Sequence, residues 1–197
     1  MSRSVRQCLL TPKEGVCVGE LKAVSACAGL VPVRIGSVTV DEMDLECMTS
    51  LSPFGDALAL DGALKKAHGV GWPQAGQALG DATARVVWFG RNEAVLIGPE
   101  ADQGLSDVAA VVDLSDAWAA VSIEGAGTVN ALARLVPVDL RAAAFGEGQT
   151  VRTQLGHLGA SITKLGPERF MILVFRSMAA TFIHDLKQAM AGVASRG

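Results

Sequence analysis

The alternation of apolar and polar positions divides this chain into an irregular beginning and a patterned remainder. Over the first thirty or so residues, turn-forming positions such as Pro12 and Gly19 interrupt short apolar stretches. Neither the two-residue period of a strand nor the helical period of about 3.6 residues is sustained there. We therefore expect residues 1–30 to form an extended arm and residues 31–197 to form one folded domain.

The first part of this domain shows the patterns of strands and one helix. Residues 31–43 alternate between apolar and polar side chains, which predicts a strand. Residues 50–69 change to helical spacing, with apolar positions at Leu58, Leu60, Leu64 and Ala67. Two apolar runs, 83–90 and 93–99, flank a short polar dipeptide and are typical of an antiparallel hairpin.

The second part of the domain repeats this succession. Residues 107–114 and 117–125 are apolar runs joined by a turn at Ser115-Asp116, which predicts two further strands. A helix is expected over residues 127–136, since Pro137 cannot continue it.

The C-terminal part predicts three more strands, over residues 151–159, 160–166 and 169–175. An amphipathic helix follows over residues 177–192, with Ser177 as its N-cap and Gly192 at its end.

These elements predict an α+β fold. Strand pairs joined by hairpin-length turns favour antiparallel sheets, and the single helices between them are expected to pack on one face of those sheets. The domain falls into two sub-halves, about 31–100 and 108–193. The pattern leaves open whether these are a degenerate duplication or two sub-sheets.

Composition agrees with a folded, soluble protein. Half of the residues are apolar, 19% are charged and the net charge is -3, which gives no basic surface for a nucleic acid. The longest apolar runs are interrupted by charged and turn residues, so we expect no membrane span and no membrane partner.

The four cysteines, at positions 8, 17, 27 and 47, form no C-x-x-C pair and no recognised zinc spacing. The beginning of the chain lacks the apolar stretch of a signal peptide and carries Lys13 and Glu14 there. We therefore expect reduced thiols and a cytoplasmic protein. Metal binding by an arm folded back on itself is the alternative.

Candidate chemistry is sparse. His157 has no cysteine or carboxylate close in sequence, so a structural or interface role is favoured over that of a general base. His184 is expected on the surface of the last helix, and His68 near the C-terminus of an earlier one, where a cation is favourable. The glycine-rich start of the helix after Gly125 lacks the remaining residues of a nucleotide-binding motif and indicates a helix-entry turn.

Other polar and aromatic residues suggest contacts with another chain. Acidic residues cluster at Asp41, Glu42, Asp44 and Glu46, where an exposed turn is favoured over a cation site or a pairing with a basic surface. Arg176 precedes the last helix and is able to hold a carboxylate with two hydrogen bonds. We predict subunit contacts by Arg176, His157, Trp88 and Trp118, and no catalytic, cofactor-binding or metal-binding residue in this chain.

Residues 110–140 resemble the folate-binding superfamily of the glycine-cleavage T-protein, through Asp113-Leu114-Ser115, Gly125 and Asp139-Leu140. Within it, the chain looks more like the gamma subunits of heterotetrameric sarcosine oxidases. The segments that carry this likeness are W-F-G-x-x-E-x-x-L-I-G-P from Trp88 to Pro99, T-Q-L-G-H-L-G-A-S-I, and F-x-I-L-V-x-R-S. The resemblance covers roughly residues 53–193, and its motifs are turns and strands, not catalytic signatures.

The resemblance implies a fold similar to the folate-binding domain of the T-protein and a non-catalytic, assembling role. The complex would contain larger flavin-binding alpha and beta subunits and a small delta subunit, and it would carry FAD, FMN, NAD and tetrahydrofolate. It would oxidatively demethylate sarcosine to glycine, transfer the one-carbon unit to tetrahydrofolate and produce hydrogen peroxide. The arm is then expected to wrap a partner subunit.

Three other functions stay open at this point. The chain is alternatively a gamma-like subunit of a related dehydrogenase of N-methyl amino acids, such as N-methylglutamate dehydrogenase. It is otherwise a stand-alone folate-binding protein, although it lacks the K-G-C-Y-x-G-Q-like motif expected there, or an independent small-molecule enzyme, for which no nucleophile and base lie close together in the sequence.

Overall fold

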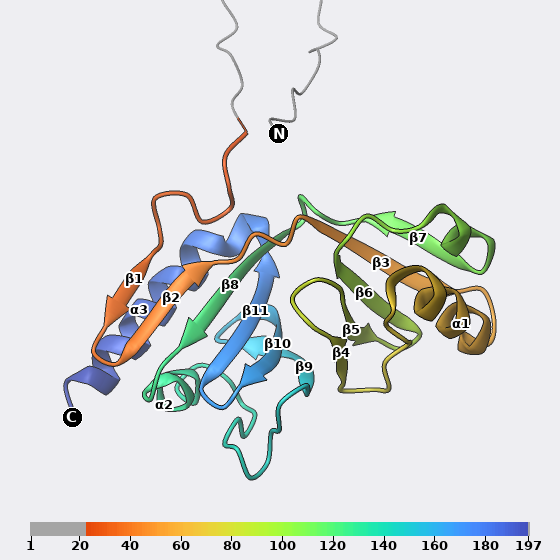
Figure 1. Cartoon of the computed structure of the whole chain (residues 1–197). Coiled ribbons are helices and arrows are strands. Elements are labelled where there is room, and N and C mark those ends of the chain that lie inside the picture. The colour runs from red at the N-terminus through yellow and green to blue at the C-terminus, as the bar shows by residue number, and fades with distance from the viewer. Residues whose placement is uncertain (1–22, 197) are drawn as a thin grey trace, which may run out of the picture.

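Two antiparallel sheets, each with helices on one side, make up the protein in a computed structural model that describes residues 23–196 (Figure 1). Most of the predicted arm, residues 1–22, lies outside the described range, and so does its proposed contact with a partner. Within residues 23–196, no helix is long and apolar enough to cross a bilayer.

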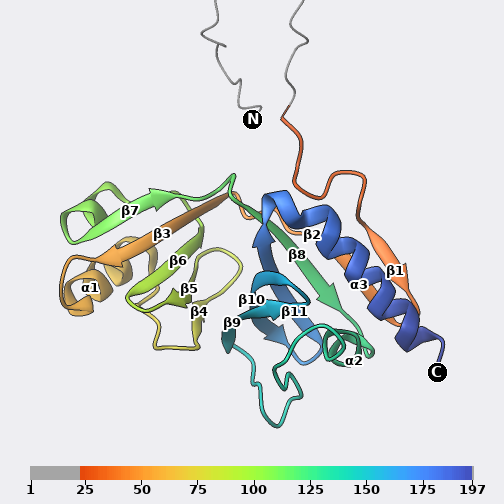
Figure 2. The same ribbon diagram turned by 180° about the vertical axis from the view of Figure 1, so that it is seen from behind.

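The larger sheet has six strands in the order β1-β2-β8-β11-β10-β9. Their bounds are Val33–Ile35 (β1), Val38–Glu42 (β2), Trp118–Glu124 (β8), Arg169–Phe175 (β11), Leu158–Gly166 (β10) and Thr150–Leu155 (β9). Two helices, Thr128–Leu132 (α2) and Ala179–Ala194 (α3), pack on its outer face. Figure 2 shows α3 lying across β1, β2 and β8.

The smaller sheet has five strands in the order β4-β5-β6-β3-β7. Their bounds are Ala78–Gly80 (β4), Arg85–Gly90 (β5), Glu93–Gly98 (β6), Cys47–Pro53 (β3) and Ala109–Asp113 (β7). Helix α1, Ala57–His68, covers its outer face together with a short 3₁₀ helix, Gln103–Asp107.

Alternation along the strands gives each sheet two apolar faces. The outer faces pack on the helices, and the inner faces meet in what we call the inter-sheet core. The smaller sheet contributes Met48, Val87, Phe89, Val95 and Ile97 to this core. The larger sheet contributes Trp118, Ala120, Met171 and Leu173. The molecule is therefore layered as helix, sheet, sheet, helices.

The chain passes between the sheets at two neighbouring crossings, residues 43–46 from β2 to β3 and residues 114–117 from β7 to β8 (Figure 1). Backbone hydrogen bonds fasten each crossing, since the Met43 N–H donates to the Ala120 carbonyl at 2.9 Å. The Leu114 N–H likewise donates to the Met48 carbonyl at 2.7 Å. Both crossings thus lie at the same edge of the inter-sheet core.

Local sequence explains the bounds of α1. The carboxylate of Asp56 caps its N-terminus by accepting from the Leu58 N–H at 3.1 Å, and Gly69 ends it in the left-handed conformation with φ 72°. The predicted apolar face is confirmed at Leu60 and Leu64, which are completely buried. The prediction is wrong at Leu58, which lies two residues before Leu60 and so on nearly the opposite side of the helix, and at Ala67; both are exposed.

The fold class is confirmed, since both sheets are antiparallel and each is covered by helices on one face. The hairpin of residues 83–90 and 93–99 is confirmed as β5 and β6, which pair antiparallel.

Two strand predictions are wrong in their pairing. Residues 31–43 form the hairpin β1–β2 and not one strand, because Gly36 takes a left-handed conformation with φ 59° and reverses the chain. Residues 107–114 and 117–125 are strands, but they do not pair with each other. The turn between them carries the chain from one sheet to the other, so β7 pairs with β3 and β8 with β2 and β11.

Each sheet also contains strands from both of the predicted halves, 31–100 and 108–193. Strands β1 and β2 join the larger sheet with the later elements, and β7 joins the smaller sheet with the earlier ones. The division of the chain into domains stays a prediction.

Element ends differ from the sequence pattern in several places. The predicted strands 151–159 and 160–166 are divided at Gly156-His157, where the chain turns from β9 into β10, and residues 50–53 of the predicted helical segment belong to β3. The predicted helix 127–136 is α-helical only over α2, after which the chain continues in turns to Pro137. Ser177 does not cap the last helix, because it lies inside a 3₁₀ turn, Arg176–Met178 (η2), that precedes α3. That helix continues past Gly192 to Ala194, and the lack of a side chain at Gly192 leaves room for Arg134, whose Nη2 would lie 3.0 Å from a Cβ there.

We predict that Gly125→Ala destabilises the protein by roughly 3 kcal/mol or more in urea unfolding, because two penalties combine at this position. Its φ is +120°, and a Cβ would lie 1.9 Å from the carbonyl oxygen of Ser37 in the β1–β2 turn. The matched control is Gly62→Ala in α1, where a Cβ meets nothing within 4 Å. That variant should gain about 0.5–1 kcal/mol from reduced backbone entropy, and equal effects of the two substitutions would contradict the prediction.

Candidate functional site

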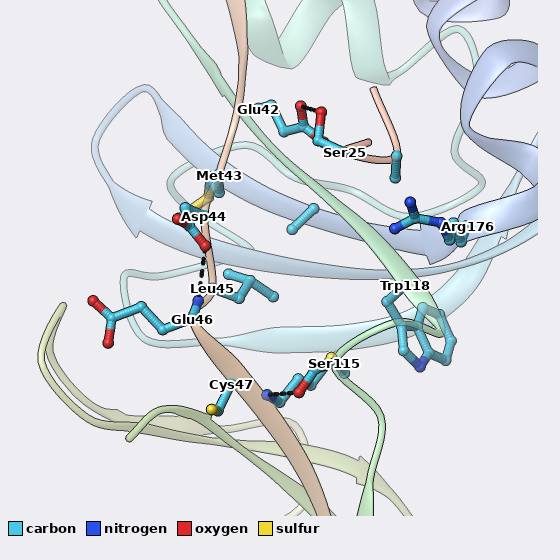
Figure 3. A pocket seen from close by; sticks show the side chains of 13 residues that line it. Ser25, Glu42, Met43, Asp44, Leu45, Glu46, Cys47, Ser115, Trp118 and Arg176 are labelled. Atoms are coloured by element: carbon cyan, nitrogen blue, oxygen red, sulfur yellow. Dashed lines mark hydrogen bonds between the residues drawn. The ribbon is translucent and has the colours of Figure 1, made fainter. Parts of the chain in front are cut away.

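A cavity of about 370 Å³ opens where the two crossings lie side by side (Figure 3). It is lined by Ser25, Ala26, Glu42, Met43, Asp44, Leu45, Glu46, Cys47, Met48, Ser115, Trp118, Ala120 and Arg176. In Figure 3, Arg176 and Trp118 lie on one side of this space and Asp44 and Glu46 on the other. The cavity thus joins an apolar floor to groups of both charges.

Arg176 is positioned by the start of η2, directly after β11. Its backbone N–H donates to the Ala117 carbonyl at 2.9 Å, which ties η2 to the second crossing. Its guanidinium donates through Nη2 to the Val24 carbonyl. Arg176 therefore holds the first described residues of the chain against the mouth of the cavity.

The acidic cluster at this cavity builds turns. Glu42 accepts from the Ser25 hydroxyl at 2.6 Å and from the Cys27 N–H at 2.9 Å, so it too fastens the incoming chain. Asp44 accepts from the Glu46 N–H at 3.0 Å, next to a left-handed backbone at Glu46 with φ 54°. Within residues 23–196, no group of three or more histidine, cysteine or acidic side chains is arranged to hold a metal ion.

Trp118 begins β8 and is 8% exposed. Phe175 stacks on its ring at a centroid distance of 4.5 Å, and Phe89 meets it edge to face at 5.0 Å. The guanidinium of Arg152, on β9, lies 4.0 Å from the centroid of Phe89 and 5.4 Å from that of Trp118. Trp118 is therefore shared between the inter-sheet core, the cavity and a group of aromatic and cationic side chains.

Of the four residues predicted to contact another subunit, the structure brings together Arg176 and Trp118. His157 is exposed in the turn between β9 and β10, away from the cavity lining. Trp88 is half-buried on β5, on the opposite face from Phe89, which belongs to the inter-sheet core. As subunit contacts, all four stay predictions.

The other candidate residues from the sequence, two histidines and the glycine-rich segment, lie outside the cavity lining. His184 is exposed on α3, and Nε2 of His68 accepts from the Asp102 N–H at 3.3 Å just before α1 ends. The glycine-rich segment leads from β8 into α2 through Gly127, with no side-chain cap. It is the helix-entry turn that the sequence predicted.

The motif Asp113-Leu114-Ser115 builds the second crossing. Oδ1 of Asp113 accepts from both the N–H and the hydroxyl of Ser115, at 2.9 and 2.6 Å. The Ser115 oxygen then accepts from the Met48 N–H at 3.1 Å, on β3 just after the neighbouring crossing. These side chains join two segments 67 positions apart in the sequence.

The other motif residues are also structural. Asp139 forms a two-pronged interaction with the guanidinium of Arg141, at 2.9 Å to Nε and 2.6 Å to Nη2, and it also accepts from the Arg141 N–H. The Arg141 guanidinium and N–H lower the pKa of Asp139 to about 2. Leu140 between them is buried in the core beneath α2 and α3. Each motif therefore fixes a turn or a packing contact.

The arrangement defines a class of protein: two facing antiparallel sheets under helices, with turn-building polar groups and an open cavity at the crossings.

Cys27, the buried thiol behind this cavity, is a poor nucleophile, because burial and the nearby Glu42 carboxylate raise its pKa to about 11.

Comparison with known proteins identifies the family. No protein-family model matches this chain. The chain is 30% identical to the sarcosine oxidase subunit gamma of Corynebacterium sp. (strain P-1), over 68% of this chain and 70% of that protein. It is 29% identical to the protein of the same name from Corynebacterium sp. (strain U-96), over 66% of this chain and 68% of that protein.

A solved structure is similar over nearly the whole chain. It is the heterotetrameric sarcosine oxidase from Corynebacterium sp. U-96 in complex with pyrrole 2-carboxylate, matched with a TM-score of 0.71 and 25% identity. The match covers 87% of this chain and 96% of the matched chain. The present chain belongs to the family of sarcosine oxidase gamma subunits, which confirms the resemblance found in the sequence.

Sequence reasoning missed Phe89, Arg152 and Phe175, which surround Trp118. Phe175 and Phe89 appear in the sequence as ordinary members of apolar strands, and Arg152 as one polar position in an alternating strand. The signal that was available is Phe175 itself, which follows five buried residues and lies directly before the motif residue Arg176.

We predict that Cys27 makes stability fall at alkaline pH. The folded-state pKa of about 11 exceeds the ordinary value of 9.0. The contribution of the neutral thiol to the free energy of unfolding is therefore complete below pH 9, and it is lost as the pH rises towards 11. Urea unfolding of the wild type and Cys27→Ala at several pH values measures it. The stability advantage of the wild type should shrink by about 2 kcal/mol across this window, and an advantage that stays constant would contradict the prediction.

Proposed function

We propose that this chain is the gamma subunit of a heterotetrameric sarcosine oxidase and that its role is to assemble and support the complex. The observation that carries the proposal is the extent of the structural match, which spans 87% of this chain and 96% of one chain of a heterotetrameric sarcosine oxidase. Two chains that agree over their whole folds, and are also related in sequence, are expected to occupy the same place in their assemblies.

The described residues support a structural role. The polar residues Asp113, Ser115 and Asp139, which carry the likeness to the T-protein superfamily, are engaged in hydrogen bonds that form turns. A general base needs a reacting group within hydrogen-bond distance, whereas His157 and His184 project from exposed positions on separate elements. The chemistry of the complex is then supplied by other subunits.

The finer assignment follows the resemblance. The partners are larger flavin-binding alpha and beta subunits and a small delta subunit, in the cytoplasm. The cofactors FAD, FMN, NAD and tetrahydrofolate bind to those subunits, and none binds to this chain. The reaction is the oxidative demethylation of sarcosine to glycine, with transfer of the one-carbon unit to tetrahydrofolate and production of hydrogen peroxide.

The test is an affinity purification of the tagged chain from its native cells, followed by mass spectrometry and an absorption spectrum. We expect a yellow complex that contains two larger flavin-binding chains and consumes oxygen when sarcosine is added. The isolated chain, expressed alone, should be colourless and inactive.

Other outcomes separate the alternatives. A flavin complex that oxidises N-methylglutamate and not sarcosine would make the chain a gamma-like subunit of a related dehydrogenase. A colourless, partner-free chain that binds tetrahydrofolate would contradict the proposal and favour a stand-alone folate-binding protein.

A further inference from the structure

Four side chains from four strands form one stacked group where the inter-sheet core reaches the surface. Phe175 (β11) stacks on Trp118 (β8), Trp118 meets Phe89 (β5) edge to face, and the guanidinium of Arg152 (β9) lies over Phe89 and faces Trp118. We call these four residues the aromatic–arginine stack. They come from both sheets, so the inter-sheet core holds them in place.

Both ends of this stack are open to solvent. Phe175 is 50% exposed although it belongs to a strand whose preceding five residues are buried. Met178, on the next turn of chain, is 41% exposed, and Arg152 is an exposed residue. Phe175 is an exposed aromatic ring held against a buried tryptophan, so it would lose little side-chain conformational entropy when a partner binds. Its apolar area therefore favours binding.

The charge on Arg152 is only partly compensated within the described residues. Its Nη1 donates to the Phe89 carbonyl at 3.3 Å, and among residues 23–196 it forms no ion pair within 4 Å. Burial around the guanidinium lowers the pKa of Arg152, and the carboxylate of Glu93 opposes that shift from a distance. Glu93 itself accepts a hydrogen bond from the Ser50 hydroxyl at 2.9 Å.

A guanidinium has several N–H donors in a fixed fork, and one carbonyl leaves most of them available. Because the aromatic faces already remove part of its water, an incoming carboxylate gains a stronger interaction here than on an open surface. A carboxylate, whose two oxygens match the guanidinium fork, would therefore complete the hydrogen bonding of Arg152. An apolar side chain would cover the exposed ring of Phe175.

We propose that the aromatic–arginine stack is a docking surface for a segment of a larger subunit that presents an Asp or Glu carboxylate beside an apolar side chain. This inference rests on the proposed function and names where the partner binds. Arg and aromatic residues are enriched at protein interfaces, and Trp and Arg are among the residues that most often carry the binding energy. The stack brings both types together at one point.

A second exposed apolar pair provides a control. Phe54 is 69% exposed and Leu58 is 73% exposed at the start of α1, on the outer side of the smaller sheet. Arg169 provides the matched charge control, because it is exposed at the opposite end of β11 from Phe175 and pairs with Glu124 at 3.6 Å. Neither control residue belongs to the stack.

The experiment purifies the complex through a tag on this chain, co-expressed with the other subunits, and measures how tightly each variant is retained. Arg152→Ala and Phe175→Ala should each weaken the affinity about thirtyfold, the size of a central interface truncation. Arg152→Lys keeps the charge without the fork and should fall between the wild type and Arg152→Ala. Arg169→Ala and Phe54→Ala should retain the wild-type affinity.

The outcomes separate the two proposals. If the wild-type chain recovers no larger subunit, the proposed function and this inference both fail. If the wild type recovers the complex and the two stack variants do so equally well, only this inference is overturned. Circular dichroism and thermal unfolding of each isolated variant show whether a loss of affinity arises from misfolding.

A photo-crosslink tests the contact without removing the stack. Benzoylphenylalanine in place of Phe175 should form an adduct with a larger subunit, and in place of Phe54 it should form none. The crosslinked peptide is expected to contain an Asp or Glu next to an apolar residue. An adduct from position 54 alone, or a peptide from position 175 without a carboxylate, would overturn the proposal even if Arg152→Ala fails to fold.

Discussion

The contact between the inner faces of the two sheets is the constraint on which the other features of this protein depend. Helices cover only the outer faces, so separation of the sheets would expose the whole inter-sheet core, including Met48, Phe89 and Trp118. Each such large side chain stabilises the folded state by roughly 1.5–3 kcal/mol through its burial. The turns at the crossings must therefore place the sheets face to face, and hydrogen bonds of Asp113 and Ser115 do so.

The same contact explains why the proposed docking surface lies where it does. Trp118 and Phe89 belong to the inter-sheet core, while Phe175 and Arg152 continue that packing to solvent. A rigid core thus orients exposed groups at its edge, so binding there costs little further ordering. If the stack docks a larger subunit as proposed, assembly and folding share one set of aromatic contacts, and the chain contributes the shape and charge of this edge to the complex.

Several residues that carried the resemblance have the same kind of role, since each fixes a turn or a close backbone approach. Gly125 allows a close approach to the Ser37 carbonyl, Asp139 closes a turn with Arg141, and Ser115 ties the second crossing to β3. These residues carried the likeness to the T-protein superfamily, and each fixes a local backbone geometry that few side chains satisfy. Such a likeness concerns the fold and says little about catalysis.

The sequence by itself determined the local elements and the family. Apolar alternation located nearly every strand after residue 80, and Asp56 and Gly69 set the ends of α1. The segments Trp88 to Pro99, T-Q-L-G-H-L-G-A-S-I and F-x-I-L-V-x-R-S indicated the gamma-subunit family. The sequence pattern missed β3, whose run Cys47–Pro53 mixes polar and apolar residues, and the three-residue strand β4. Beyond the β5–β6 hairpin, only the tertiary structure decided which strands pair, because a turn such as Ser115-Asp116 has the same local pattern whether it closes a hairpin or leads into another sheet. It also decided that Arg152, Phe89, Trp118 and Phe175 meet, since contacts between strands far apart in the sequence depend on how the two sheets pack and leave no period along the chain.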